Sequence, residues 1–286
     1  MTRKQALLSI HLSAILFGLT GIFGELIHAS ASMITAGRAG FACLALYAFM
    51  RWQNQPLMRG VDGRTFLLLA SAALMLAVHW VTFFIAVKVG GVAIATLGFA
   101  SFPAFITLFE RFVLKDAVGT EEWLILLLVT VGLLLVTPSF DFQDEATVGL
   151  GWAVLSGLTF ALFTLLNRVT SSRLAAEQAA CWQNLLVLLL TLPFVTDDPA
   201  GLGAMDWMWI AMLGVFCTGL SHYLMVGSLS VLNARSAGII IALEPVYAIA
   251  FAALLFAQYP SVRMLLGGAI MVGAIIWSGL RKHAPA

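Results

Sequence analysis

Ten long apolar segments follow one another along the chain, separated by short stretches of polar and turn-forming residues. A helix needs about 20 predominantly apolar residues to cross a bilayer. The chain is 61% hydrophobic and 10% charged, whereas soluble domains carry about 25% charged residues. The pattern predicts an all-α integral membrane protein with ten transmembrane helices. We place these helices at 5–27, 31–51, 64–88, 90–114, 120–138, 148–169, 174–195, 205–231, 233–257 and 261–281.

Basic residues lie mostly at alternate ends of these segments. Cytoplasmic loops of membrane proteins are enriched in Lys and Arg. With the N-terminus inside, the inner segments hold 12 of the 15 basic residues, and the outer loops are acidic. The exceptions are Lys88 and Arg263 in outer segments and Arg38 inside the second helix. We therefore predict that both termini are cytoplasmic, and we interpret Lys88, Arg111 and Arg168 as helix-end charges that extend to the interface.

The two halves of the chain resemble one another. “FPAFITLFERFVLKD” begins at Phe102 and “EPVYAIAFAALLFAQ” begins at Glu244, so that Pro103 aligns with Pro245 at an offset of 142 residues. At similar offsets “FGLTG” (17–21) aligns with “SGLTF” (156–160). Each half holds five helices, and because five is odd the second copy is inverted in the membrane. We predict two inverted five-helix repeats, at 1–143 and 144–286.

A family resemblance follows from these features. The ten segments, the two halves and “EPVYAIAFAALLFAQYPSVRMLLGGAIMVGAII” resemble the drug/metabolite transporter superfamily, and within it the EamA family. That family has a Pro in its fourth helix, Glu-Pro-Val in its ninth and a Gly-rich last helix. The resemblance covers essentially the whole chain and implies export of small metabolites; within the family, the chain is similar to the aromatic amino acid exporters. It departs from the family at Lys115-Asp116 and Gln258, where members often have Glu.

Motifs of other protein classes are absent from the sequence. There is no P-loop, no His-Glu-x-x-His motif and no Gly-x-Ser-Gly elbow with a partnered His, so we predict neither an enzyme nor a cofactor. Cys43, Cys181 and Cys217 lie far apart in apolar runs and predict neither a disulfide nor a metal site. A net charge of +1 gives no reason to expect a nucleic-acid partner. A small-solute channel or facilitator, and an intramembrane enzyme, stay as alternatives to a carrier.

Polar groups inside the membrane are functional candidates, because burying them there is unfavourable. Glu244 lies near the middle of the ninth segment. It either binds a substrate amine or takes part in proton coupling, or it serves as a structural pin in a broken helix. We expect a different pair, Glu25 and Arg38, to form an ion pair near the outer side.

Proline residues mark the fourth and ninth segments. Pro103 and Pro245 each remove a backbone hydrogen bond near the centre of a predicted helix. We interpret them, together with Gly98 and Gly238, as hinges of a gate; the alternative is a static kink that shapes a cavity. In the last segment, Ala269, Gly273 and Trp277 recur at a spacing of four and predict a packing ridge.

Two histidines, His79 and His222, occupy matching places in the third and eighth segments, and each precedes an aromatic residue. They either line one substrate chamber or are packing groups with satisfied hydrogen bonds. The remaining candidates for the chamber lie beside the features that the two halves share. They are Phe17, Thr20, Phe83, Phe99, Phe102, Phe160, Phe163, Thr164, Tyr223 and Tyr247.

The candidate chamber is chemically lopsided, because Phe102 in one half aligns with Glu244 in the other. Such a chamber suits an amphipathic solute with an amine end and an apolar or aromatic side chain. We therefore expect a secondary transporter of amino acids, including aromatic ones, in a bacterial inner membrane. Its partners would be the solute and the lipid bilayer, and the sequence does not support a homodimer.

Overall fold

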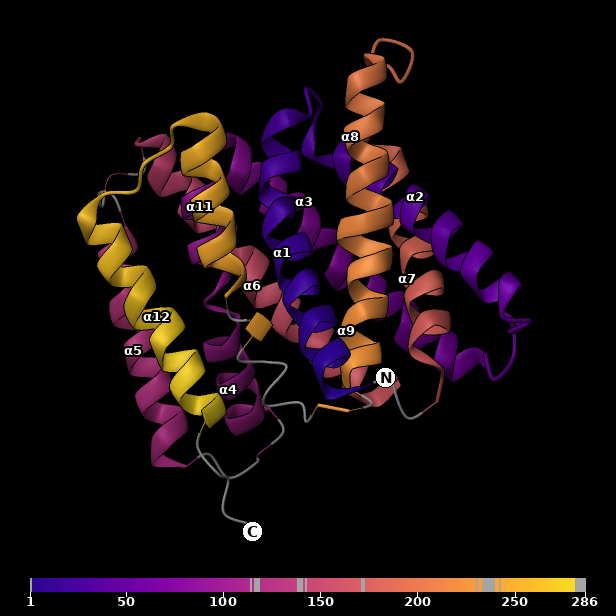
Figure 1. Ribbon diagram of the computed structural model, residues 1–286, viewed down its shortest axis with the longest axis horizontal. Coiled ribbons are helices and arrows are strands. Elements are labelled where there is room, and N and C mark those ends of the chain that lie inside the picture. Colours follow the sequence, from indigo (N-terminus) through magenta and orange to yellow (C-terminus); the bar gives the residue numbers. More distant parts are fainter. Residues whose placement is uncertain are drawn as a thin grey trace.

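The computed structural model describes residues 2–113, 115, 119–137, 141, 143–170, 173–229, 231–232, 240–241 and 243–280. Within these ranges the chain forms helices and no strands, which confirms the predicted all-α class (Figure 1). The first repeat contributes α1 (Arg3–Leu26), α2 (Ala31–Trp52), α3 (Gly63–Phe99), α4 (Phe102–Phe112) and α5 (Thr120–Val136). The second contributes α6 (Glu145–Thr170), α7 (Ala176–Thr191), η1 (Leu192–Phe194), α8 (Ala204–Gly214), η2 (Val215–Leu220), α9 (Ser221–Leu229), α11 (Glu244–Phe256) and α12 (Val262–Leu280).

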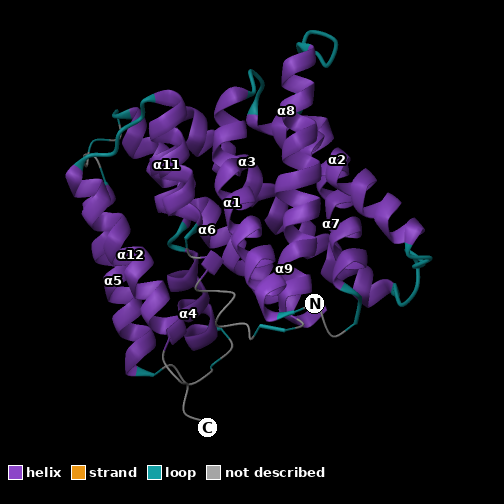
Figure 2. Ribbon diagram, in the orientation of Figure 1, coloured by secondary structure: helices purple, strands orange, loops and turns teal. Residues whose placement is uncertain are grey.

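Several of these helices are long and apolar enough to cross a bilayer. In the part of the chain that the structure describes, five helices meet that requirement, and shorter apolar helices lie at Glu122–Val136, Glu244–Phe256 and Val262–Trp277. Most loops gather at two opposite ends of the bundle in Figure 2, as expected for helices that run across a membrane. The chain is therefore a multi-pass membrane protein.

Short polar side chains start the first three helices, α1, α2 and α3. The hydroxyl of Thr2 caps α1 in a capping box with Gln5, and the hydroxyl of Ser30 accepts from the backbone N–H of Met33 at the start of α2. Such caps satisfy N–H groups that have no partner inside the helix. Asp62 caps α3 by accepting from the backbone of Thr65 at 2.7 Å. Hydrogen bonds from Thr65 hold the pKa of Asp62 below its ordinary value.

The two repeats cross over one another. Helix α1 packs against α9 and α11 of the other repeat, and α6 in turn packs against α3 and α4. The equivalent helices α2 and α7 pack together, as do α5 and α12, which lie side by side at the left of Figure 1. This exchange of partners is what a pseudo-twofold axis in the membrane plane produces. The residue at which one repeat gives way to the next, placed at 143–144, stays a prediction.

The third and fourth predicted segments meet inside α3. Gly91 lies there in a non-helical conformation with φ 80° and ψ 168°, a region that glycine adopts without strain. The predicted boundary between 64–88 and 90–114 lies just before this residue. The fourth segment is then broken once more, at a turn formed by Ala100 and Ser101, so that the prediction of one helix over 90–114 is wrong.

The proline residues begin new helices, and the prediction of a kink inside a continuous helix is therefore corrected. Pro103 is the second residue of α4, and Pro245 is the second residue of α11. Proline is well tolerated in the first turn, where its missing N–H has no helical acceptor to lose. Figure 1 shows α4 in the lower half of the molecule and α11 in the upper half. Of the hinge candidates, Gly238 lies outside the described residues.

A glycine from the opposite repeat packs against each break. A Cβ on Gly18 of α1 would lie 3.0 Å from Tyr247 Cβ and 3.1 Å from the carbonyl oxygen of Glu244. A Cβ on Gly157 of α6 would lie 2.8 Å from the Ser101 hydroxyl and 3.0 Å from the carbonyl oxygen of Phe99. Gly18 and Gly157 are the aligned glycines of “FGLTG” and “SGLTF”. The shared motif therefore serves close approach of a helix to the break in the other repeat.

Helices α5 and α12 pack through glycine as well, but not on the predicted ridge. A Cβ on Gly132 would lie 2.3 Å from Met271 Cγ, and one on Gly267 would lie 2.7 Å from the carbonyl oxygen of Gly132. A Cβ on Gly273 would meet nothing within 4 Å, and Ala269 is exposed. Ala269 and Gly273 of the predicted ridge thus face outward, whereas Trp277 packs against the core cluster that contains Met271. The packing face of α12 is rotated toward Gly267 and Met271.

Candidate functional site

A cluster of aromatic rings surrounds the break between α3 and α4. Phe99 and Phe102, on either side of the turn, stack with their ring centroids 5.3 Å apart. Phe160 of α6 meets Phe102 edge-on at 5.1 Å, and the ring of His79 lies 4.9 Å from Phe160 and 5.1 Å from Phe99. Such ring pairs stabilise beyond the burial of their area. We call these rings, together with the rings in contact with them, the aromatic cluster: His79, Phe83, Phe99, Phe102, Phe160 and Phe163.

Hydrogen bonds with α6 hold His79 in the cluster. Its Nδ1 lies 2.7 Å from the Ser156 hydroxyl and 3.1 Å from the Ser156 carbonyl oxygen. That hydroxyl in turn donates to the carbonyl oxygen of His79 at 3.1 Å. When Nδ1 carries the ring proton, it is the donor in these contacts with Ser156. His79 therefore joins the repeats while its ring face lies against Phe99 and Phe160.

His222, the aligned histidine, has different neighbours. It is half-buried, and its ring meets Phe17 edge-on at 6.5 Å. Tyr223 turns to another face, where it is 50% exposed and lies 4.8 Å from Phe49. The structure therefore brings His222 and Phe17 together but places Tyr223 on the surface of the bundle.

The other predicted residues occupy separate positions. Tyr247 lies beside α1, with its hydroxyl 3.4 Å from Nδ1 of His11. Thr164 donates to the carbonyl oxygen of Phe160 in its own helix at 2.8 Å, and Thr20 is buried in α1. Gly98 is a packing contact, because a Cβ there would lie 2.5 Å from the Ala153 Cβ.

Glu244 is the first residue of α11 and is half-buried. Among the described residues, its carboxylate has no hydrogen-bond or ion-pair partner. It lies at the positive end of the helix dipole, where a negative charge is favoured. The equivalent first residue of α4 is Phe102. Neither helix start has a side-chain cap, so no hydrogen bond from Glu244 pins the break.

Arg38 is the residue that sequence reasoning misplaced, and the predicted Glu25–Arg38 ion pair is wrong. Arg38 is 4% exposed. Its Nε donates to the Thr218 hydroxyl at 2.6 Å, and its guanidinium lies over the Trp80 ring at 4.1 Å from the centroid. Glu25 instead accepts from the side-chain amide of Gln258 at 3.3 Å. The signal was present in the sequence, since a lone Arg in an apolar segment is itself a functional candidate.

Two local features position Arg38. The backbone of α2 approaches α8 so closely that a Cβ on Gly214 would lie 2.6 Å from the Arg38 carbonyl oxygen. Thr218 belongs to η2, a π-helical turn, and its hydroxyl donates to the carbonyl oxygen of Leu213 at 3.0 Å. π-Helical turns are frequent at functional sites. The hydroxyl proton is used by Leu213, so its oxygen is directed toward the Arg38 Nε.

The charge of Arg38 acts on the other ionisable groups in the bundle. It interacts electrostatically with Glu244, His79 and His222. The charge of Arg38 is thus felt by both histidines and by the acidic start of α11.

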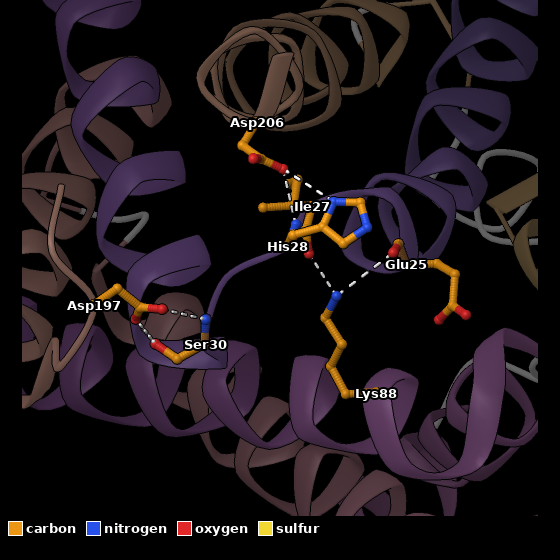
Figure 3. A network of polar contacts seen from close by, with 7 residues as sticks. All are labelled: Glu25, Ile27, His28, Ser30, Lys88, Asp197 and Asp206. Atoms are coloured by element: carbon orange, nitrogen blue, oxygen red, sulfur yellow. Dashed lines mark hydrogen bonds and ion pairs between the residues drawn. The ribbon is translucent and has the colours of Figure 1, made fainter. Parts of the chain in front are cut away.

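A second polar network ties the C-terminal end of α1 and the N-terminal end of α2 to neighbouring elements (Figure 3). The Lys88 ammonium donates to the carbonyl oxygen of Ile27 at 2.5 Å, at the end of α1. The His28 ring pairs with the Asp206 carboxylate, which also accepts a hydrogen bond from the backbone N–H of His28 at 2.9 Å. The backbone and hydroxyl of Ser30 both donate to Asp197. Lys88, which lies inside α3 just before the break at Gly91, is therefore a cap on α1.

Burial and hydrogen bonding act in opposite directions on Asp197, which lies in the loop before α8. Burial raises the pKa of its carboxyl, whereas hydrogen bonds from Ser30 lower it, and the net pKa is below the ordinary value. This loop contact is separate from the intramembrane groups. In the described ranges, no group of three or more His, Cys, Asp or Glu side chains is placed to hold a metal ion.

A helical bundle of two inverted repeats with broken helices, one of which begins with a carboxylate, is the architecture of a secondary transporter. The chain belongs to the EamA-like transporter family, whose model matches residues 4–137 and 147–280. An uncharacterized transporter of Bacillus subtilis (strain 168), YxxF, is 22% identical over 290 residues, covering 99% of this chain and 92% of the relative. An uncharacterized transporter of Archaeoglobus fulgidus is 24% identical over 271 residues, with 94% of each chain covered.

A solved crystal structure shares the fold. It superimposes with a TM-score of 0.68 over 96% of this chain and 98% of that chain, at 16% sequence identity. At this identity the likeness shows the fold alone. The family model, which matches both halves of the chain, thus establishes a membrane transporter. Its substrate has to be inferred from the geometry of the site.

Proposed function

We propose that this protein is a carrier that exports amino acids, including aromatic ones, across the inner membrane of a bacterium. The observation that carries the proposal is the different chemistry at the starts of the two broken helices. Glu244 begins α11 with a carboxylate that has no partner among the described residues, and Phe102 begins α4 within the aromatic cluster. A carboxylate suits a substrate amine, and the rings suit an apolar or aromatic side chain.

Alternating access is the mechanism that best fits the crossed packing of the repeats. Rocking of one set of helices against the other would open the region around the two helix starts to each side in turn. The aligned Gly18 and Gly157 would allow close sliding contact at the breaks. A channel would need a continuous polar path, and the packed rings of the aromatic cluster weigh against one.

The orientation and direction of transport rest on other arguments. The distribution of basic residues supports cytoplasmic N- and C-termini, and the export direction rests on the family resemblance. The proposed partners are a small-molecule solute and the lipid bilayer.

Uptake into proteoliposomes tests the proposal. Labelled amino acids, sugars and inorganic ions are offered separately to the purified full chain. We expect saturable uptake of amino acids, with Phe, Tyr and Trp preferred, and uptake weakened about 10- to 100-fold in Glu244→Gln, the range for losing hydrogen bonds to a charged group. Glu25→Gln is the matched control at the outer end of α1 and should retain uptake. Uptake restricted to sugars or inorganic ions would refute the proposal.

A further inference from the structure

The side chain of Arg38 is buried but only partly satisfied. Its Nε donates to Thr218 at 2.6 Å, while the two Nη groups have no hydrogen-bond or ion-pair partner among the described residues. An arginine that is 4% exposed in a membrane helix is strongly disfavoured unless its charge has a use or a partner. An arginine with a purely structural role would be expected to donate hydrogen bonds from all its N–H groups to neighbouring carbonyl or carboxylate oxygens.

The protein holds this guanidinium in one orientation. Trp80 supports one face at 4.1 Å, and Phe84 lies at 5.9 Å from the same group. Thr218 fixes the Nε edge. The orienting contacts therefore come from α3 and from the π-helical turn of the second repeat, and they leave the two Nη groups as free donors. A planar pair of N–H donors matches the two oxygens of a carboxylate.

The surrounding charges define what such an anion could be. Glu244, at the start of α11, is a second charged group without a partner among the described residues, and no ion pair joins it to Arg38. If the two groups served only to neutralise each other, direct contact would be favoured in this environment. An unpaired cation and an unpaired anion inside one helical bundle are complementary to the two charged ends of a zwitterion.

We propose that Arg38 binds the α-carboxylate of the transported amino acid, with Glu244 binding its α-amine. This inference rests on the proposed function, which it deepens by assigning the carboxylate end of the substrate to α2. The orienting residues are Trp80 and Thr218. The site then discriminates an amino acid from the amine with the same side chain, because only the amino acid has a carboxylate to accept hydrogen bonds from the two Nη groups of Arg38.

Three probes that share one side chain test the inference: L-phenylalanine, phenethylamine, which lacks the carboxylate, and 3-phenylpropionate, which lacks the amine. Binding of each is measured by titration calorimetry on the purified full chain. In the wild type we expect phenylalanine to bind about 10- to 100-fold more tightly than phenethylamine, the range for hydrogen bonds to a charged group. In Arg38→Met this ratio should fall toward one, while phenethylamine binding is retained.

Controls separate loss of the site from loss of the fold. Lys88→Met removes an exposed cation outside the site, at the end of α1, and should keep the wild-type ratio. Arg38→Lys keeps the charge without the planar fork and should give an intermediate ratio, which serves if Arg38→Met does not yield a monodisperse protein. Thr218→Val, which frees the Nε edge, should lower the ratio less than Arg38→Met does.

The outcomes distinguish this inference from the proposed function. If the wild type binds phenylalanine and Arg38→Met keeps the full ratio, Arg38 is not the carboxylate site, although amino acid binding stands. If the wild type binds 3-phenylpropionate but not phenylalanine, and Arg38→Met abolishes that binding, the anion site stands and the amino acid proposal fails. Binding of none of the three probes by the wild type overturns both.

Discussion

Replacing Gly157 by alanine should destabilise the protein, because α6 packs on the broken helix at this glycine. The new Cβ would lie 2.8 Å from the Ser101 hydroxyl, 3.0 Å from the Phe99 carbonyl oxygen and 3.3 Å from the Phe102 nitrogen. Two of these three atoms belong to the backbone of the turn, and the hydroxyl is held by its own hydrogen bond to the Gly98 carbonyl oxygen at 2.7 Å. None of them can move without disturbing the break.

The size of the effect is set by two opposing contributions. Overpacking of a tight contact costs about 1–3 kcal/mol. Alanine in a helix gains up to about 1 kcal/mol over glycine. Gly151 in the same helix is exposed, and a Cβ there meets nothing within 4 Å. Gly151→Ala should therefore gain only the helix propensity of alanine. The difference in free energy of unfolding between Gly157→Ala and Gly151→Ala then gives the steric cost, about 1–3 kcal/mol.

The free energy of unfolding of both variants can be measured by SDS titration in mixed micelles, with fluorescence of the 8 tryptophans as the signal. Gly18→Ala tests the equivalent contact in the other repeat, where a Cβ would lie 3.1 Å from both the Ala248 nitrogen and the Glu244 carbonyl oxygen. Both Gly18→Ala and Gly157→Ala should be less stable than Gly151→Ala. Equal stability of Gly157→Ala and Gly151→Ala would refute the crossed packing at the breaks.

Further predictions concern the contact between α2 and α7 and the loop before α8. The sulfur atoms of Cys43 and Cys181 lie 4.0 Å apart between α2 and α7, so mild oxidation should join them in a disulfide, whose sulfur–sulfur bond is about 2 Å long. Mass spectrometry should find Cys217 still free. An unchanged count of three free thiols would contradict the α2–α7 packing. The lowered pKa of Asp197 means that its bonds with Ser30 stabilise the protein at neutral pH, and that this stability is lost as the pH falls from about 4 through the lowered folded-state value. The free energy of unfolding of the wild type, measured against pH, should fall over this range. An equal fall in Asp197→Ala, which lacks the carboxylate, would argue against the contact.

Much of the architecture follows from the apolar pattern. Segments of about 20 apolar residues have few alternatives to membrane-spanning helices, because every backbone polar group must be satisfied inside the bilayer. The repeat was detectable because Pro103 and Pro245 open equivalent helices. The nature of the breaks was not predicted, since a proline permits either a kinked helix or a new helix start, and the choice depends on the packing of Gly18 and Gly157 from the opposite repeat.

The site was only partly accessible from the sequence. Neighbours of the breaks, such as Phe99, Phe102 and Phe160, were proposed together and do contact one another. Arg38 was assigned to an outer ion pair because helix depth alone does not tell which way a long side chain turns. Its true neighbours, Trp80 and Thr218, come from helices far away in the sequence, and no periodic pattern connects them.

The central claim is that two inverted repeats expose one amino acid site to each side of the membrane in turn. Counterflow tests it most directly: proteoliposomes are loaded with unlabelled L-phenylalanine, and entry of a trace of labelled phenylalanine is followed from outside without any ion gradient. A carrier of this kind should show a transient, saturable accumulation of label above equilibrium, driven by exchange with the internal phenylalanine. Entry that is unaffected by internal phenylalanine and rises linearly with its external concentration would contradict alternating access.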